Sequence, residues 1–385
     1  MYFASLHAVP WTDGNNPLTL KESFSDDRTK QTSEKMTLND SLNQESPKYL
    51  KMSLAAAMTL KFVPGLFYRG ARLGCVNLLL HYSDGCKANC SFCGLASQRK
   101  SDGSVKSFIR VPWPIYSKDD IIKAIKTAPK HVTRICISMV THPKSKRDTI
   151  AICRELVDKT GLAVSLLITP TLLNREDLIA MKMAGAERIG VAVDAATEDL
   201  FISLRGKPVK GPHDWNKYWK IYEESLDVFG KGMVGVHLIC GLGETELQMV
   251  SAIWRARKMG GSTHLFSFYP EHGSAMESVP SPPVGQYRRI QLARWLIDND
   301  IIEADSIDYD TKGRITSFGL GKDLMEEIIN SGSPFQTSGC PGPDGKVACN
   351  RPYGNEKPGP NIRNFPFTPQ PEDVNQIKDE IVRYE

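Results

Sequence analysis

Residues 76–94 of this 385-residue chain read VNLLLHYSDGCKANCSFCG, an apolar run followed at once by a loop with three cysteines. Five more apolar, β-rich runs follow it, and segments with helical periodicity separate them. Strands that are apolar along their whole length need cover on both faces, as in parallel sheets flanked by helices. The six runs are Val76–Leu80, Val132–Val140, Ala163–Ile168, Arg188–Val193, Val234–Cys240 and His264–Phe268.

Six strand–helix units in order predict an α/β fold, namely a partial or full TIM-like (β/α) barrel over residues 56–330. An open, doubly wound sheet is the competing interpretation, because strand order is invisible in a sequence. Residues 1–55 are rich in polar side chains and predict a mobile tail, with Met52 as an alternative start. Residues 331–385 are rich in Pro and Gly, which predicts an irregular extension ending in a short helix over 372–383.

The composition narrows the class of protein. With 41% hydrophobic and 24% charged residues, the chain can bury a full core and is not disordered throughout. No apolar stretch reaches the roughly 18 residues of a membrane helix, and the N-terminus lacks the pattern of a secretory signal. The net charge of +4 is dispersed, which argues against nucleic acid or a membrane surface as partner. Nine cysteines without an export signal indicate a reducing compartment, so we expect a cytoplasmic protein.

The strongest chemical signal is the C-x3-C-x2-C pattern of Cys86, Cys90 and Cys93, which lets three thiolates face a common centre. Soft thiolates bind zinc or iron–sulfur clusters. A structural zinc site needs a fourth ligand, and none follows at zinc-finger spacing, although His81 lies shortly upstream. Three thiolates instead leave one iron of a [4Fe–4S] cluster open to another ligand.

With aromatic Phe92 before its third cysteine, on the loop after the first strand, this motif resembles that of radical S-adenosylmethionine (SAM) enzymes. The resemblance covers roughly residues 70–330. It implies that Cys86, Cys90 and Cys93 hold a [4Fe–4S] cluster and that SAM binds its open iron. It also implies that one electron cleaves SAM to methionine and a 5′-deoxyadenosyl radical, which removes hydrogen from an unactivated carbon. The alternatives are a structural metal loop or chance spacing.

The same resemblance implies a set of SAM-binding residues at strand ends. Residues 237–244, HLICGLGE, resemble the adenine-contacting motif G-x-I-x-G-x-x-E with His in the first place; the alternative is a turn whose Glu244 caps the next helix. Asp194 is expected near the ribose unless it starts a helix, and Arg205 near the carboxylate of SAM unless it is a solvated charge. The Gly-Gly-Glu-like run of many members is replaced by residues 137–142, ISMVTH, where Ser138, Thr141 or backbone carbonyls would bind the SAM amino group. The predicted residues are Ser138, Asp194, Arg205, His237, Gly241 and Glu244.

A second cysteine pair, Cys340 and Cys349, lies in a loop with little apolar surface, where a metal would supply ordering energy. We expect an auxiliary iron–sulfur cluster completed by Cys75, by Ser338 or by another group. The alternatives are two buried thiols or a redox-active pair. Two other cysteines, Cys153 and Cys240, are expected to be structural.

Cys136 stands in Arg134-Ile-Cys136-Ile, which resembles the biotin synthase segment that holds one ligand of a [2Fe–2S] cluster. Biotin synthase has further cysteine ligands on later strands, where this chain has SLLI at 165–168 and GVHL at 235–238. Biotin synthase also lacks the C-terminal cysteine loop. Plain biotin synthase is therefore disfavoured.

Over about residues 52–370, the chain most resembles one component of the two-protein lipoyl synthase of many archaea and some bacteria. The resemblance rests on MSLAAAMTLKFVPGLFYRG at 52–70 and on TSGCPGPDG and CNRP in the cysteine loop. It implies a sulfurtransferase that inserts sulfur at C6 or C8 of an octanoyl chain carried on a lysine, with sulfur from the auxiliary cluster. The implied partners are an octanoylated lipoyl carrier protein, a second lipoyl synthase component, and flavodoxin or ferredoxin as electron donor. No catalytic side chain is singled out.

Two rival functions stay open. One is a radical SAM mutase or biotin-synthase-like enzyme acting on a small free substrate. The other is a non-catalytic iron–sulfur electron carrier, which would need no nucleoside pocket. Two local interpretations stay open as well: residues 264–269 line an aliphatic channel or pack as core, and the face of Tyr287, Arg288 and Arg289 meets an acidic carrier or is solvated.

Overall fold

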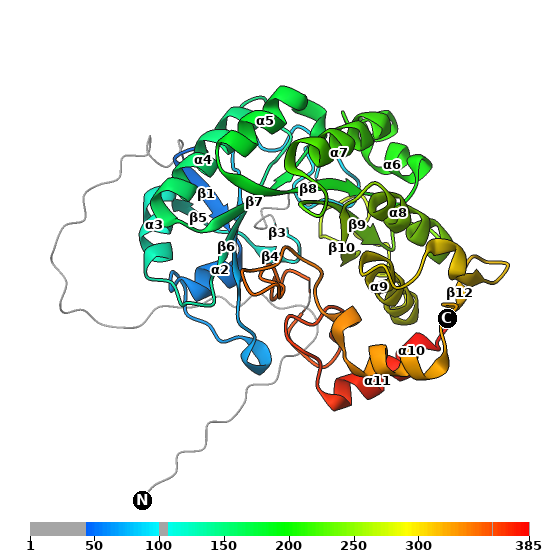
Figure 1. Cartoon of the computed structure of the whole chain (residues 1–385). Helices are drawn as coiled ribbons and strands as arrows, with labels where there is room; N and C mark the ends of the chain where they lie inside the picture. Colours follow the sequence, from blue (N-terminus) through cyan, green and yellow to red (C-terminus); the bar gives the residue numbers. More distant parts are fainter. Residues whose placement is uncertain (1–43, 100–106, 356, 385) are drawn as a thin grey trace, which may run out of the picture. The chain divides into compact units, whose positions relative to one another are not determined.

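The computed structural model describes residues 44–99, 107–355 and 357–384. Its main feature is a curved eight-stranded sheet in the order β10-β9-β8-β7-β6-β2-β1-β5 (Figure 1). Six strands run parallel, while β1 and β5 are antiparallel to their neighbours. The strands of this sheet are β1 Tyr49–Met52, β2 Cys75–Leu79, β5 Ile115–Ser117, β6 Arg134–Ser138, β7 Ala163–Ile168, β8 Ala186–Asp194, β9 Val234–Cys240 and β10 Ser262–Ser267.

The parallel strands follow one another in chain order, which confirms the predicted TIM-like barrel. A doubly wound sheet would reverse its order at a switch point, and this one does not. The end strands β10 and β5 do not pair with each other within the described part of the chain, so the barrel is partial. All six predicted strands form where the apolar runs lie.

Helices cover the outer face of the sheet, where Figure 1 shows α3, α4, α5, α7 and α8. The predicted helix after the second apolar run is α4, and its buried face includes Cys153, a core residue as expected. Among the described residues, no helix has both the length and the apolar character needed to cross a bilayer. The helices are α2 Leu54–Thr59, α3 Lys118–Lys126, α4 Ser145–Thr160, α5 Arg175–Met183, α6 Glu198–Arg205, α7 Trp215–Phe229, α8 Glu246–Lys258, α9 Val284–Asp298, α10 Lys322–Asn330 and α11 Pro371–Ile381.

Short elements complete the fold. The hairpin of β3 and β4 lies between the cysteine loop and β5, and the hairpin of β11 and β12 precedes α10. In the described part of the chain, five short 3-10 helices lie in the connections between these elements. These elements are β3 Ser107–Phe108, β4 Val111–Pro112, β11 Asp308–Tyr309 and β12 Ile315–Ser317, with η1 Tyr68–Gly70, η2 Pro170–Leu172, η3 Lys207–Val209, η4 Ala304–Ser306 and η5 Ser333–Phe335.

The predicted polar tail of residues 1–55 extends too far along the chain. Residues 1–43 lie outside the described residues, but β1 and the start of α2 fall within the predicted tail. Leu50 and Met52 are fully buried, and Met52 pairs with Leu78 of β2. Their alternation with half-buried Tyr49 and Lys51 is the two-residue period of a strand, a pattern too short to stand out beside the polar residues before it.

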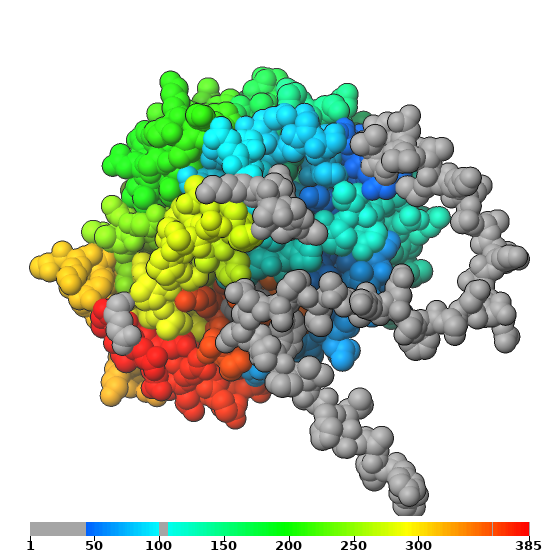
Figure 2. All heavy atoms as spheres, turned by 180° about the vertical axis from the view of Figure 1, so that it is seen from behind, coloured from blue at the N-terminus to red at the C-terminus, as the bar shows by residue number. Residues whose placement is uncertain are grey.

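The C-terminal extension is irregular, as predicted, until α11. It packs against α9, and in Figure 2 the orange-to-red residues lie next to the yellow segment of the chain. Arg288 donates to the carbonyls of Ile362 and Arg363 and pairs with Glu380 at 2.7 Å. Both expectations for the Tyr287–Arg289 face are therefore wrong, because these three side chains are buried under the extension instead of meeting solvent or a carrier.

Arg289 of α9 joins the extension to the barrel through a buried ion pair. Its guanidinium bonds both carboxylate oxygens of Glu246 in α8, with Nη2–Oε1 at 2.6 Å, and donates to the carbonyls of Ile381 and Arg383. We expect Arg289→Met to lower the free energy of unfolding by about 3–5 kcal/mol, because Glu246 then stays buried without its partner. Urea denaturation measures the change.

The matched control is Arg257→Met, which removes an ion pair with the exposed Asp300. A surface pair of this kind contributes about 0–1 kcal/mol. Equal losses in the two variants would show that the extension is not anchored through Arg289.

Candidate active site and cysteine clusters

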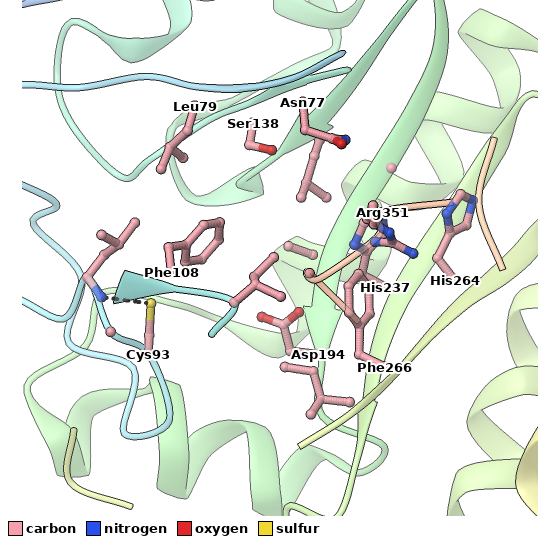
Figure 3. A pocket seen from close by; sticks show the side chains of 18 of the residues that line it. Asn77, Leu79, Cys93, Phe108, Ser138, Asp194, His237, His264, Phe266 and Arg351 are labelled. Carbon is pink, nitrogen blue, oxygen red and sulfur yellow. Dashed lines mark hydrogen bonds between the residues drawn. The ribbon is translucent and has the colours of Figure 1, made fainter. Parts of the chain in front are cut away.

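Inward-facing side chains of the six parallel strands line one cavity (Figure 3). Successive side chains of a strand point to opposite faces, so residues two apart share the interior. Four of the six predicted SAM-binding residues line the cavity: Ser138 at the end of β6, Asp194 at the end of β8, Arg205 at the end of α6 and His237 in β9. The residues of these strands that line it are Asn77, Leu79, Cys136, Ser138, Ser165, Leu166, Leu167, Ile168, Gly190, Ala192, Asp194, His237, Ile239, His264, Phe266 and Ser267.

The loop with Cys86, Cys90 and Cys93 closes one side of the cavity, and all three cysteines line it. The loop is tied down at two points. Lys87 N donates to Thr141 O at 2.7 Å, next to the end of β6, and Ser91 N donates to Leu204 O at 2.9 Å in α6. These bonds hold the three thiols at the carboxyl ends of the strands, where β/α barrels carry their active sites.

Burial controls the ionisation of two of these thiols, Cys90 and Cys93. Burial raises the pKa of Cys90 and Cys93, so both stay protonated at neutral pH until a cation displaces the protons. Arg205 opposes this rise at Cys90, and Leu95 N donates to Cys93 Sγ at 3.3 Å, the dashed line of Figure 3. Backbone N–H groups that point at cysteine sulfur are a known means of tuning iron–sulfur clusters.

Arg205 ends α6 and is 3% exposed, so it is not a solvated loop charge. Its guanidinium pairs with Asp194 at 3.2 Å and donates to the carbonyls of Ala192 and Val193. Its Nε has no partner in the described structure. Asp194 ends β8 with φ 65° and does not start a helix, since α6 is capped by Thr197. Arg205 and Asp194 thus form one buried pair beside Cys90.

Only part of the predicted adenine-contacting motif, residues 237–244, lines the cavity. His237 lines the cavity, and burial lowers its pKa, so the ring is neutral. Gly241 and Glu244 are not among the lining residues. The Glu244 carboxylate accepts from Gly241 N at 2.7 Å and from Leu242 N at 3.0 Å, which shapes the turn after β9. Thr245, not Glu244, caps α8.

Two glycines make room for a stacked pair of histidines. His237 and His264 lie opposite each other on β9 and β10, with ring centroids 5.0 Å apart. A Cβ on Gly190 would lie 2.9 Å from His237 Nε2, and one on Gly235 would lie 2.9 Å from His264 Cδ2. The neighbouring strand must therefore lack a side chain at each position.

Four cysteines from distant parts of the chain converge in the barrel interior: Cys75, Cys136, Cys340 and Cys349. Hydrogen bonds from the thiols of Cys136 and Cys75 hold the pKa of Cys349 well below its usual range. Burial raises the pKa of Cys340, and the charge of the nearby Cys349 adds to this rise. Asn77 Nδ2 adds a hydrogen bond to Cys349 Sγ at 3.4 Å.

Cys136 is the member of this group that sequence reasoning did not assign to it. It faces the interior because it lies two residues before Ser138 and opposite Asn77 on β2. Ser338, the other suggested ligand, is occupied elsewhere, since its hydroxyl accepts from Leu265 N at 2.7 Å. The two-residue spacing to Ser138 was the available signal for Cys136.

Two arginines, Arg134 and Arg351, lie near the second group of cysteines. Arg351 lines the cavity together with Cys349; its guanidinium is 4.0 Å from the centroid of Phe266 and donates to Ser338 O at 2.7 Å. Arg134 is 3% exposed and donates to Pro341 O at 2.9 Å. Both place positive charge where four thiolates would gather, which favours their ionised form.

Among the described residues, neither cysteine group surrounds a site for a single metal ion. Within the described ranges, no three His, Cys, Asp or Glu side chains meet at the spacing that one ion needs. Thiolates around a [4Fe–4S] cluster each bind a different iron, so their sulfurs stand further apart. Cys153 and Cys240 belong to neither group and are fully buried, as expected of structural thiols.

Comparison with known proteins identifies the first group. A family model described as the radical SAM superfamily matches residues 80–253. Biotin synthases from two strains of Streptococcus agalactiae, NEM316 and 2603 V/R, are each 24% identical over 223 residues. These matches cover 57% of this chain and 61% of each relative, so the chain spans about three fifths of the relatives' length.

Two solved structures resemble part of this chain. HydG, a maturase of the [FeFe]-hydrogenase, is 12% identical with a TM-score of 0.45, over 63% of this chain and 53% of that chain. The radical SAM methyltransferase TsrM from Kitasatospora setae is 13% identical with a TM-score of 0.35, over 55% of this chain and 40% of that chain.

The packing of Gly190 against His237 can be tested by Gly190→Ala. The added Cβ would lie 2.9 Å from Nε2 of the His237 ring, and the stacked His264 limits how far that ring can move away. We expect the free energy of unfolding to fall by about 1–3 kcal/mol, measured by urea denaturation.

Gly321→Ala is the control, because open space surrounds Gly321 and its φ is −61°. We expect a change below about 1 kcal/mol there. If the two variants unfold alike, the histidine stack is loose and does not define the cavity wall.

Proposed function

Residues 80–253 form a radical SAM domain, so the chain belongs to the radical SAM superfamily, and we propose that it is a sulfur-insertion enzyme. The proposed reaction adds sulfur to an unactivated carbon of a protein-bound octanoyl chain, as one component of a lipoyl synthase. The observation that carries the proposal is the convergence of Cys75, Cys136, Cys340 and Cys349 beside the cavity that the radical SAM cysteines close. Four thiols in one place suit an auxiliary cluster, which is a source of sulfide.

The chemistry divides between the two cysteine groups. A [4Fe–4S] cluster with SAM on Cys86, Cys90 and Cys93 would supply the radical that removes hydrogen from carbon, and an auxiliary cluster on the other four cysteines would supply the sulfur. Three of those four, Cys136, Cys340 and Cys349, line the same cavity as the radical SAM loop. One substrate in this cavity can therefore approach both groups.

The cavity walls suit an aliphatic substrate. Residues 264–269, which were expected either to line a channel or to pack as core, contribute His264, Phe266, Ser267, Phe268 and Tyr269 to the wall. An apolar wall desolvates an alkyl chain and excludes water from the reacting carbon. The apolar residues from other segments include Leu79, Phe92, Leu95, Phe108, Ile109, Val111, Trp113, Met139, Val140, Leu166, Leu167, Ile168 and Ile239.

The polar groups at the carboxyl ends of the strands have distinct tasks in this proposal. The buried pair of Arg205 and Asp194 would position SAM beside Cys90, while Ser138 would face its amino group. Glu244 acts through the backbone of its own turn. The implied partners are an octanoylated carrier protein, a second lipoyl synthase component, and flavodoxin or ferredoxin as electron donor.

A biotin-synthase-like enzyme for a small free substrate is the second candidate, favoured by the 24% identity to two biotin synthases. It shares the use of Cys136 on β6. Cys340 and Cys349 distinguish this chain. They lie beyond the segment that the superfamily model matches, and they join the second cysteine group from the C-terminal extension.

Iron content tests whether the second cysteine group holds a cluster. We expect the Cys86→Ala, Cys90→Ala, Cys93→Ala triple variant, reconstituted without oxygen, to keep about four irons and four sulfides per chain. About two irons would favour the biotin-synthase-like [2Fe–2S] candidate. No bound iron would remove the sulfur donor and contradict the proposal.

Product analysis separates the two cysteine groups. We expect Cys349→Ala to keep producing 5′-deoxyadenosine from SAM and reductant but to form no sulfur-bearing octanoyl product, because only the second group loses a ligand. Cys90→Ala, the control, should lose both products. Sulfur insertion by Cys349→Ala at the wild-type yield would show that the second group is structural only.

A further inference from the structure

Asn77 is a buried polar residue in the middle of β2, a place that disfavours asparagine. The residue is 6% exposed, and every other residue of the strand is Cys, Val or Leu. Asparagine is depleted in strands, and a buried amide costs free energy unless it is hydrogen-bonded. The partners of this side chain therefore indicate what the residue does.

The Asn77 side chain bonds only to sulfur in the described part of the chain. Nδ2 donates to Cys349 Sγ at 3.4 Å and lies 3.9 Å from Cys75 Sγ. Cys75 is two residues earlier on the same face of β2, and Cys136 is the direct neighbour of Asn77 on β6. Asn77 thus lies among three of the four cysteines of the second group, and it lines the cavity (Figure 3).

The direction of the amide follows from the state of Cys349. The pKa of Cys349 is well below its usual range, chiefly because of hydrogen bonds from Cys136 and Cys75, and the bond from Asn77 acts in the same direction. An ionised or metal-bound sulfur accepts hydrogen bonds and cannot donate them, so Nδ2 and not Oδ1 faces it. Oδ1 has no partner among the described residues, and it is not one of the polar atoms that solvent fails to reach. The amide therefore presents its donor to the cysteines.

On the basis of the function proposed above, we propose that Asn77 raises the reduction potential of the auxiliary cluster through its hydrogen bond to the ligand sulfur of Cys349. A reduced cluster carries one more negative charge than an oxidised one, so the positive end of an N–H dipole stabilises the reduced state more. Hydrogen bonds to the sulfurs are one of the means by which proteins set cluster potentials. Burial strengthens the effect, because little water is present to screen the dipole.

A raised potential favours sulfur insertion in particular. When a carbon radical bonds to a sulfide, R• and S²⁻ give RS⁻ and one electron, which an iron of the cluster takes up. A cluster of higher potential accepts that electron more readily. Asn77 is therefore a positioning residue, which acts on the reaction through the cluster and does not touch the reacting carbon.

The experiment measures the potential of the auxiliary cluster in the reconstituted Cys86→Ala, Cys90→Ala, Cys93→Ala triple variant, which lacks the ligands of the other cluster. A redox titration followed by electron paramagnetic resonance gives the midpoint. We expect Asn77→Leu, added to this variant, to lower the equilibrium constant of one-electron reduction about tenfold, a shift of about 59 mV to more negative potential. An asparagine with a structural role only would lower the Tm and leave the potential unchanged.

Leu79→Val is the matched control. Leu79 is two residues further along the same interior face of β2 and lines the cavity, but it has no group that donates to sulfur. Its substitution changes the packing of the strand and should leave the potential unchanged. If Asn77→Leu does not keep its iron, Asn77→Ala repeats the comparison, because its side chain cannot donate either.

A potential that stays unchanged in the Asn77 variant, or that shifts as far in Leu79→Val, overturns the role of Asn77 while leaving the proposed function intact. Absence of iron from the triple variant itself overturns both.

Discussion

The site depends on the close packing of the C-terminal cysteine loop against the start of β2. The backbone of Ala348 passes so near Gly74 that a Cβ there would lie 2.6 Å from its carbonyl oxygen. Arg134 and Asn350 bond the loop to the strands, and α9 holds the rest of the extension through Arg288 and Arg289. The sequence separation between Cys75 and Cys349 makes this contact entropically costly, and the buried network around it offsets that cost.

Burial is the largest cause of the raised pKa values of Cys75, Cys90, Cys93 and Cys340. Four neutral thiols can share a low-dielectric interior, whereas four bare thiolates would repel one another. Of the four thiols, only Cys349 has a lowered pKa, because hydrogen bonds from Cys136 and Cys75 and the charge of Arg351 favour its thiolate. The buried Arg205 and Arg351 contribute positive charge near each group.

The two cysteine groups differ in where they lie relative to the segment that the family model matches. The three-cysteine loop lies within the segment shared with the radical SAM superfamily, residues 80–253, and two of the four other cysteines lie far beyond it. The matched segment thus holds the three-cysteine loop, while the C-terminal extension supplies Cys340 and Cys349 to the same cavity.

The sequence by itself determined the barrel, its six strands and the loop of Cys86, Cys90 and Cys93, because apolar periodicity and local cysteine spacing are short-range properties. It also indicated that Cys340 and Cys349 belong together. It did not show that Cys136 joins them, that Ser338 is occupied, or that the basic face of α9 is buried. The tertiary structure alone decided these points, because strand register and the path of the extension bring together side chains that the sequence separates by up to 274 positions, from Cys75 to Cys349.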